Sequence, residues 1–103
     1  MLLVRDIFYC KPGKVRPMVE KFVAMSKLSK KMGMGEMRVL TDVSAERYWT
    51  VVSEMEVPSL DAFEKMFQGQ GQSEQDTKEF ENIMKGYHDL VEFGRREIYK
   101  LEG

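Results

Sequence analysis

The order in which the hydrophobic period changes along the chain constrains its fold more than any other sequence feature. Four segments have the apolar or alternating pattern of β-strands and are rich in β-branched and aromatic residues. These predicted strands cover residues 2–10, 36–43, 47–57 and 95–101. Three segments carry apolar residues at helical spacing, and the predicted helices begin at Val15, at Leu60 and at about Asp76. The order is therefore strand, helix, strand, strand, a helix broken in two, and strand.

Turn-forming residues separate these elements. A Pro-Gly turn at residues 12–13 ends the first strand, and Gly33 follows the first helix. Residues 44–46 are short enough to join the second and third strands as a hairpin. We expect residues 69–73 to break the second helical region at a flexible point suited to a lid or an insertion, and Gly94 to end the last helix.

The spacing of apolar residues predicts which face of each element is buried. The core face of the third strand is expected to carry Trp49, Val51, Met55 and Val57. The second helix, with Ser59 as its N-cap, is expected to bury Leu60, Phe63 and Phe67. The last helix, over residues 76–93, is expected to bury Phe80, Ile83, Met84, Tyr87, Leu90 and Val91.

This element order predicts an α+β fold with a ferredoxin-like, four-stranded antiparallel sheet and helices on one face. A chain of 103 residues is one domain, so residues 1–103 are expected to form a single unit. Helices suffice to cover one sheet face, whereas the strands are substantially apolar on both. We therefore expect a second copy of the chain to cover the other face, and the predicted partner is the chain itself in a homodimer.

Composition limits the classes of function. The net charge of −1 gives no overall attraction to nucleic acid or to anionic lipid, so neither is expected as a partner. The longest uncharged apolar run, residues 1–4, is too short for a membrane span and lacks the features of a signal peptide, so a cytoplasmic location is expected. Cys10 is the only cysteine, and neither metal-ligand spacing nor a phosphate-binding glycine loop occurs. No cofactor is expected.

Three short motifs carry a resemblance to a known superfamily. They are Lys-Pro-Gly-Lys at residues 11–14, Glu-Val-Pro-Ser-Leu-Asp-Ala-Phe at 56–63, and Gly-Arg-Arg-Glu-Ile-Tyr at 94–99. Together with the element order they resemble the dimeric α+β barrel superfamily, especially its NIPSNAP-like and antibiotic-biosynthesis-monooxygenase-like branches. NIPSNAP-like chains carry an arginine four or five residues before the Lys-Pro-Gly. This chain has Asp6 at the nearest register, with Arg5 beside it.

The resemblance implies a barrel built by two sheets and a broad set of activities. Members include cofactor-independent oxygenases of phenolic or quinone-like substrates, haem-degrading enzymes, isomerases and proteins without demonstrated chemistry. The haem-degrading branch combines a strand tryptophan and a helix histidine with an asparagine in the first strand. Here that strand has Asp6, and the only asparagine, Asn82, lies in a predicted helix, which argues against haem degradation.

His88 and Trp49 each have two interpretations. His88 is the only histidine, and its type of side chain suits proton transfer near neutral pH, so it is the candidate catalytic base. Its alternative is a histidine at the border of an apolar helix face, satisfied by solvent or backbone. Trp49 is a candidate wall of a pocket for a planar substrate, and its alternative is an ordinary core residue.

Polar side chains on the second and third strands are the other candidates. Glu54 and Glu56 share one strand face, and Arg38 is available from the neighbouring strand. These groups and Tyr48 are predicted to bind a polar ligand inside the barrel, or else to form cross-strand ion pairs at a solvated edge. The expected function is the binding of a small apolar or aromatic molecule by a homodimer. The alternatives are a cofactor-independent monooxygenase or isomerase of a small aromatic or carbonyl compound, and a structural or regulatory module without catalysis.

Overall fold

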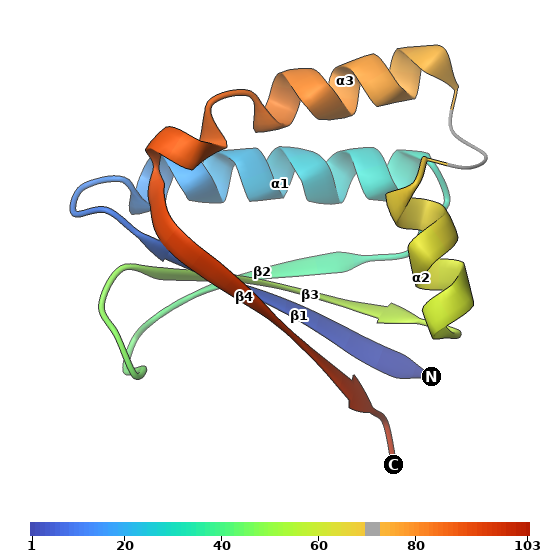
Figure 1. Ribbon diagram of the computed structural model, residues 1–103, viewed down its shortest axis with the longest axis horizontal. Helices are drawn as coiled ribbons and strands as arrows, with labels where there is room; N and C mark the ends of the chain where they lie inside the picture. Colours follow the sequence, from blue (N-terminus) through green and yellow to red (C-terminus); the bar gives the residue numbers. More distant parts are fainter. Residues whose placement is uncertain (70–72) are drawn as a thin grey trace.

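The computed structural model describes residues 1–69 and 73–103 and arranges them as one sheet with helices above it (Figure 1). Within these ranges four strands form an antiparallel sheet in the order β2-β3-β1-β4. The strands are β1 (Leu2–Cys10), β2 (Met37–Thr41), β3 (Thr50–Val57) and β4 (Val91–Lys100). The helices are α1 (Val15–Lys31), α2 (Leu60–Phe67), α3 (Glu74–Met84) and the 3₁₀ turn η1 (Tyr87–Asp89). The predicted ferredoxin-like α+β fold is confirmed.

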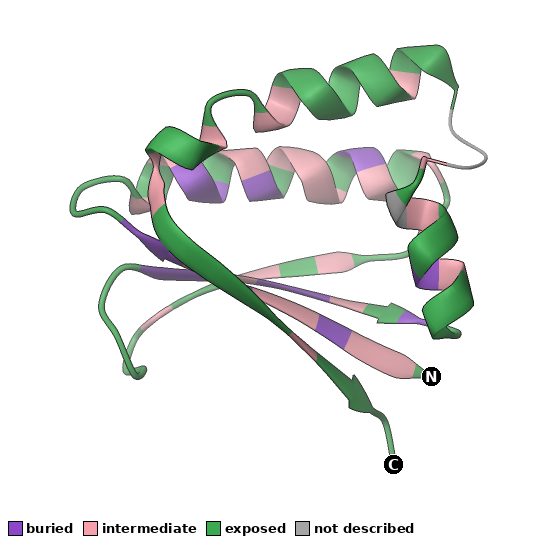
Figure 2. Ribbon diagram, in the orientation of Figure 1, coloured by how far each residue is buried: buried purple, intermediate pink, exposed green. Residues whose placement is uncertain are grey.

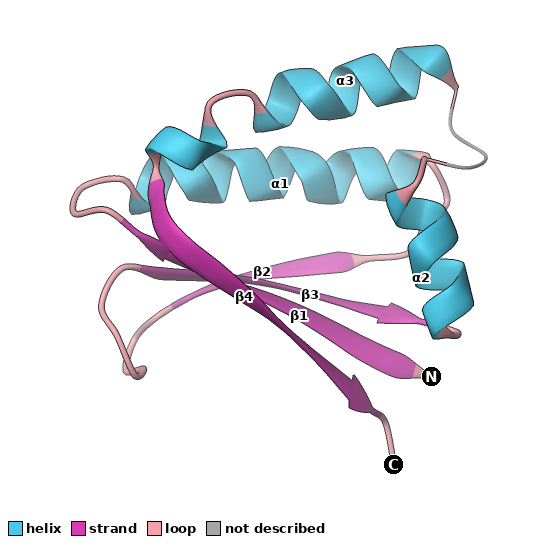
Figure 3. Cartoon of the chain, in the orientation of Figure 1, coloured by secondary structure: helices cyan, strands magenta, loops and turns pink. Residues whose placement is uncertain are grey.

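The described helices all lie on the same side of the sheet (Figure 3). Helix α1 lies over the sheet, α3 runs alongside α1, and α2 stands at one end (Figure 1). Each helical connection joins two parallel strands that are not neighbours, β1 to β2 and β3 to β4, and right-handed crossovers carry both connections to the same face. None of the helices in the described part of the chain is long and apolar enough to cross a membrane.

Two clusters of buried side chains fill the space between the sheet and the helices. Figure 2 shows the buried positions in purple on α1, α2, β1 and β3. The larger one comprises Cys10, Met18, Val19, Phe22 and Val51. The smaller one comprises Val4, Val57 and Phe63 and lies under α2. The positions of Val51 and Val57 confirm the core face predicted for the third strand.

Capping residues explain where the helices begin and end. The Oγ atom of Ser59 accepts a hydrogen bond from the backbone N of Ala62 at 3.1 Å, as predicted for the N-cap of α2. Ser73 does the same for α3, with a distance of 3.1 Å to the backbone N of Asp76. Gly33, with a φ of 72°, follows α1 in the left-handed conformation that ends a helix without steric cost.

The last helix is shorter than its apolar spacing predicts. Helix α3 ends at Met84, and Gly86 has a φ of 81°, which turns the chain away from the helical path. Residues Leu90 and Val91 therefore lie outside α3, and Val91 begins β4. The prediction that Phe80 lies in a buried stripe is wrong, because Phe80 is 41% exposed on α3.

Helix α2 buries only part of its predicted apolar face. Phe63 is buried as predicted, whereas Leu60, the first residue of α2, is 54% exposed, so the prediction that it is buried is wrong. The break expected at residues 69–73 is confirmed by its two ends, because α2 ends at Phe67 and α3 begins at Glu74. The side chain of Phe67 and residues 70–72 lie outside the described part of the chain.

Gly94 lies within β4 instead of ending a helix. It pairs with Phe8 of β1, and a Cβ atom built on it would lie 2.7 Å from Cδ1 of the Phe8 ring and 3.2 Å from the backbone O of Ile7. The Phe8 ring has little freedom to move, since it meets the ring of Phe22 edge-on at 5.3 Å. The absence of a side chain at Gly94 therefore makes room for the ring of Phe8.

Replacing Gly94 with alanine is expected to lower the free energy of unfolding by about 1–2 kcal/mol, because the added methyl group overlaps the Phe8 ring. Urea unfolding at one fixed protein concentration measures the change. Gly103→Ala is the matched control, because no atom lies within 4 Å of a Cβ placed there. A Gly94→Ala protein as stable as the control variant would contradict the close packing.

The connection between β2 and β3 is longer than the predicted hairpin and spans residues 42–49. Trp49 has a φ of 59°, so the extended conformation begins only at Thr50. The backbone N of Thr50 donates to Oδ1 of Asp42 at 2.9 Å, and the backbone N of Cys10 donates to the O atom of Trp49 at 2.8 Å. The prediction that Trp49 shares the core face of a strand is wrong, because it belongs to this loop and is 46% exposed.

Candidate functional site

The face of the sheet opposite the helices, called here the helix-free face, carries a groove of about 450 Å³. Its floor is formed by side chains that alternate with the core residues along the strands, since successive residues of a strand point to opposite faces. Three apolar or aromatic residues of the floor are Ile7, Tyr9 and Val52. Ile7 and Tyr9 are 6% and 5% exposed, although no helix of the described residues covers this side.

Glu54 is held between two arginines from the neighbouring strands. Its Oε2 atom accepts from Nε of Arg5 at 2.7 Å, and its Oε1 atom accepts from a terminal nitrogen of Arg38 at 2.9 Å. The three residues come from β1, β3 and β2, and they pair in register across the sheet. Glu54 is only 8% exposed, so these two ion pairs satisfy a buried carboxylate. The hydrogen bond to Glu54 raises the pKa of Arg5.

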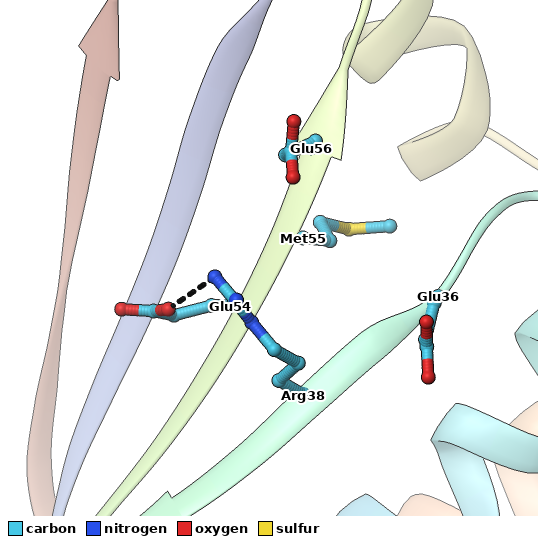
Figure 4. A pocket seen from close by; sticks show the side chains of 5 residues that line it. All are labelled: Glu36, Arg38, Glu54, Met55 and Glu56. Atoms are coloured by element: carbon cyan, nitrogen blue, oxygen red, sulfur yellow. Dashed lines mark hydrogen bonds and ion pairs between the residues drawn. The ribbon is translucent and has the colours of Figure 1, made fainter. Parts of the chain in front are cut away.

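A smaller pocket of about 100 Å³ lies beside this ion pair, between β2 and β3. Figure 4 shows Arg38 reaching across β3 toward Glu54. The lining residues are Glu36, Arg38, Glu54, Met55 and Glu56. Glu56 is exposed and lies near the end of β3. Among the described residues, no group of three histidine, cysteine or acidic side chains is placed to hold a metal ion.

A second carboxylate, Glu97 of β4, organises the other side of the groove floor. It forms an ion pair with Arg95, and its Oε1 atom accepts from the hydroxyl of Tyr99 at 3.0 Å. A terminal nitrogen of Arg5 lies 3.6 Å from the same Oε1 atom, so Arg5 links the two carboxylates. The hydrogen bonds from Arg95 and Tyr99 hold the pKa of Glu97 below its usual value. The hydrogen bond between Tyr99 and Glu97 also raises the pKa of Tyr99.

Tyr9 connects this network to the loop at the end of the groove. Its hydroxyl oxygen accepts a hydrogen bond from Nε of Arg95 at 3.1 Å. Its ring packs on that of Phe93 with 4.8 Å between centroids. The guanidinium of Arg47, which belongs to the loop, lies 4.8 Å from the Tyr9 ring and 4.7 Å from the Phe93 ring. This cation–π contact fixes the loop against the sheet where it closes one end of the groove.

The structure brings together three of the residues that the sequence indicated, Arg38, Glu54 and Glu56, at the smaller pocket, and places Tyr48, Trp49 and His88 outside both pockets. Arg38 and Glu54 form an ion pair on the helix-free face. Tyr48 lies in the loop with Trp49, 80% exposed, and its ring centroid is 5.9 Å from that of the tryptophan. His88 is exposed in η1, with its ring centroid 3.9 Å from that of Tyr87, and does not line either described pocket. The predicted place of His88 within the last helix is wrong, because that helix ends at Met84.

Sequence analysis did not indicate three of the central groove residues, Tyr9, Arg95 and Glu97. Alternation along β1 could have indicated the face of Tyr9 alone, because Val4 in the core assigns the odd-numbered residues of this strand to the opposite face. Arg95 and Glu97 join Tyr9 only through the pairing of β4 with β1. Arg5, singled out beside the arginine position of NIPSNAP-like chains, follows the same alternation and lies in the groove. Cys10 is buried in the core, and burial raises the pKa of its thiol, so it is shielded from thiol chemistry.

The fold and groove together define a ferredoxin-like α+β protein with a ligand-sized depression on the helix-free face. No family model and no curated protein matches the sequence. Among solved structures, the chain is similar to an uncharacterised NIPSNAP-like domain protein from Burkholderia xenovorans. The TM-score is 0.76 at 12% identity, covering 99% of this chain and 85% of that one.

Two oxygenase structures share the same fold. An antibiotic biosynthesis monooxygenase matches with a TM-score of 0.67 at 13% identity and full coverage of both chains. SnoaB, a cofactor-independent oxygenase from Streptomyces nogalater, matches with a TM-score of 0.60 at 9% identity, covering 99% of this chain and 93% of that one. The similarity to NIPSNAP-like and monooxygenase-like proteins expected from the sequence is therefore confirmed at the level of the fold.

Proposed function

We propose that this chain forms a homodimer through its helix-free face and binds a small aromatic molecule in the groove enclosed between the two sheets. The observation that carries the proposal is the groove of about 450 Å³, which combines an apolar and aromatic floor with ordered polar groups. Ligand sites have this combination, because apolar walls supply most of the binding energy and a few polar groups fix the orientation.

Exposed apolar side chains around the groove support the dimer. Leu40, Phe93 and Tyr99 are 42%, 48% and 47% exposed on the helix-free face. A second copy packed on this face by a two-fold axis would cover these side chains and close the open groove, as the resemblance to dimeric barrels implies.

Sedimentation equilibrium of wild-type protein at micromolar concentration is expected to give a molar mass of about twice 12.0 kDa. Leu40→Glu is expected to raise the dimer dissociation constant at least about 100-fold, because two-fold symmetry places the new charge in the interface twice. Val23→Glu is the matched control, since Val23 is 39% exposed on the helical side. A monomeric wild-type protein, or equal weakening by both variants, would contradict the proposed dimer interface.

Ligand binding is tested with an uncharged bicyclic probe, 2-naphthalenemethanol. Its fluorescence is expected to change saturably on titration with wild-type protein, because the probe enters a groove that it can fill. The Leu40→Glu variant is expected to bind it more weakly, since the groove of a monomer stays open. A linear, unsaturable signal at every protein concentration would contradict the binding proposal.

A cofactor-independent oxygenase is the second candidate. Its support is the fold shared with SnoaB together with arginine donors in the groove, which would stabilise a phenolate oxygen. His88, the base expected from the sequence, is exposed and lies outside the lining of the groove. We therefore propose ligand binding as the function and keep the oxygenase as the second candidate.

A further inference from the structure

The connection between α1 and β2 carries three closely spaced methionines. Met32, Met34 and Met37 follow the pattern Met-x-Met-x-x-Met, with a glycine on each side of Met34. Met32 is the C-cap of α1, and Met37 is the first residue of β2. All three residues are partly exposed, whereas Met18 is fully buried in the larger core cluster. An ion in solution can therefore reach these three thioethers.

Hydrogen bonds tie this connection to the last turns of α1. The backbone N of Met34 donates to the O atom of Ser29 at 2.9 Å, and Oγ of Ser26 donates to the backbone O of Met37 at 2.6 Å. An extended chain spans at most about 3.6 Å per residue, so the Cα atom of Met34 lies within about 7 Å of that of Met32 and about 11 Å of that of Met37. Methionine has a long, unbranched side chain with three rotatable bonds, which can bring the three sulfur atoms to one point.

A fourth methionine lies beside Met37 on the neighbouring strand. Met55 of β3 is the register partner of Met37 in β2. Directly opposite residues of an antiparallel pair point to the same face, with their Cβ atoms about 4.5–5.5 Å apart. Figure 4 shows the Met55 side chain extending from β3 on the side of β2. Met37 packs against the larger core cluster and Met55 against the smaller one, which fixes this pair on the helical side of the sheet.

We propose that Met32, Met34 and Met37, joined by Met55, form a binding site for a soft monovalent metal ion, Cu(I). Thioether sulfurs are soft ligands that select Cu(I), whereas Mg²⁺ and Ca²⁺ take oxygen ligands and Zn²⁺ takes thiolate, imidazole or carboxylate. None of these four methionines lines the groove, so the inference is independent of the proposed ligand binding.

The test on wild-type protein uses isotope-labelled methionine methyl groups and Cu(I) supplied as its acetonitrile complex without oxygen. NMR spectra are expected to show saturable shifts of the methyl signals of the four site methionines, complete at one ion per chain. The signals of Met18 and Met84, which pack in or against the larger core cluster, are expected to stay in place. Zn²⁺ at the same concentrations is expected to shift none of the methionine signals, because it does not favour thioethers.

Paired variants identify the ligands. Leucine replaces methionine at nearly constant volume, so the fold is expected to tolerate the exchanges. Met32→Leu/Met34→Leu is expected to raise the Cu(I) dissociation constant at least about 30-fold. The matched control, Met18→Leu/Met84→Leu, also removes two thioethers and is expected to change that constant less than about threefold. Cys10→Ala removes the only thiol, which is buried, and is likewise expected to leave Cu(I) binding unchanged.

Several results would overturn the site. They are the absence of saturable methyl shifts in wild-type protein, equal shifts with Zn²⁺, and equal weakening by the two double variants. Loss of binding in Cys10→Ala would also overturn it, because the ion would then belong to the thiol. Each of these results leaves the proposed ligand binding in the groove in place.

Discussion

Phe22→Ala is expected to lower the free energy of unfolding by about 3–5 kcal/mol, whereas Phe80→Ala should lower it by about 1 kcal/mol or less. Phe22 is 4% exposed in the larger core cluster, and its ring lies edge-on to that of Phe8. Its removal leaves a cavity between α1 and the sheet. Phe80→Ala removes the same atoms from α3. Because Phe80 is 41% exposed, its removal leaves no cavity.

Urea unfolding at a fixed protein concentration measures both changes, because a fixed concentration keeps any contribution of the proposed dimer constant. A loss of about 3–5 kcal/mol accounts for a large part of the stability of an average small domain, so Phe22→Ala should also lower the melting temperature strongly. Equal losses for the two variants would show that α3 is buried, and would contradict the packing of the helices described here.

Arg5→Met is expected to cost about 2–3 kcal/mol of unfolding free energy, because it removes the less exposed of the two arginines paired with the buried carboxylate of Glu54. Arg38→Met is the matched variant, since it removes the other partner of the same carboxylate. The Arg38 side chain is 62% exposed, against 33% for Arg5. Arg38→Met is therefore expected to cost roughly 0–1 kcal/mol of unfolding free energy, as is usual for ion pairs in contact with solvent.

A double-mutant cycle isolates the pair energy. Combining Arg5→Met with Glu54→Gln removes the Glu54 charge that has lost its Arg5 partner. The double variant is therefore expected to be more stable, by about 1 kcal/mol, than the sum of the two single losses predicts. Additive losses would show that Arg5 acts through its hydrocarbon stem and not through its charge.

Most of the fold followed from the sequence because local signals agreed with one another. The Pro-Gly turn and the change of period placed the end of β1 and the start of α1, and Ser59 placed the start of α2. The end of α3 did not follow. Leu90 and Val91 continue the helical spacing, yet pairing with β1 draws the chain into β4 as early as Val91. The glycine that ends this helical region is Gly86, eight residues before the one expected.

The candidate site followed from the sequence only in part. Alternation along β3 and β2 placed Glu54 and Arg38 on one face, and the register across the hairpin then makes them neighbours. The contributions of Tyr9, Arg95 and Glu97 depend on the pairing of β1 with β4, the first and last strands of the chain. Such long-range pairing leaves no local pattern in one sequence. Trp49 was misplaced because a left-handed backbone at a tryptophan is rare and has no sequence signal.

The sheet order leaves β4 at an open edge over ten residues, which has a consequence for solubility. An edge strand with unpaired backbone groups is a template on which further chains can add and grow into aggregates. Five charged side chains, of Glu92, Arg95, Arg96, Glu97 and Lys100, stand along this edge, and charges of this kind oppose such growth. Arg95 and Glu97, which line the groove, thus also oppose the addition of further chains along the open edge of the sheet.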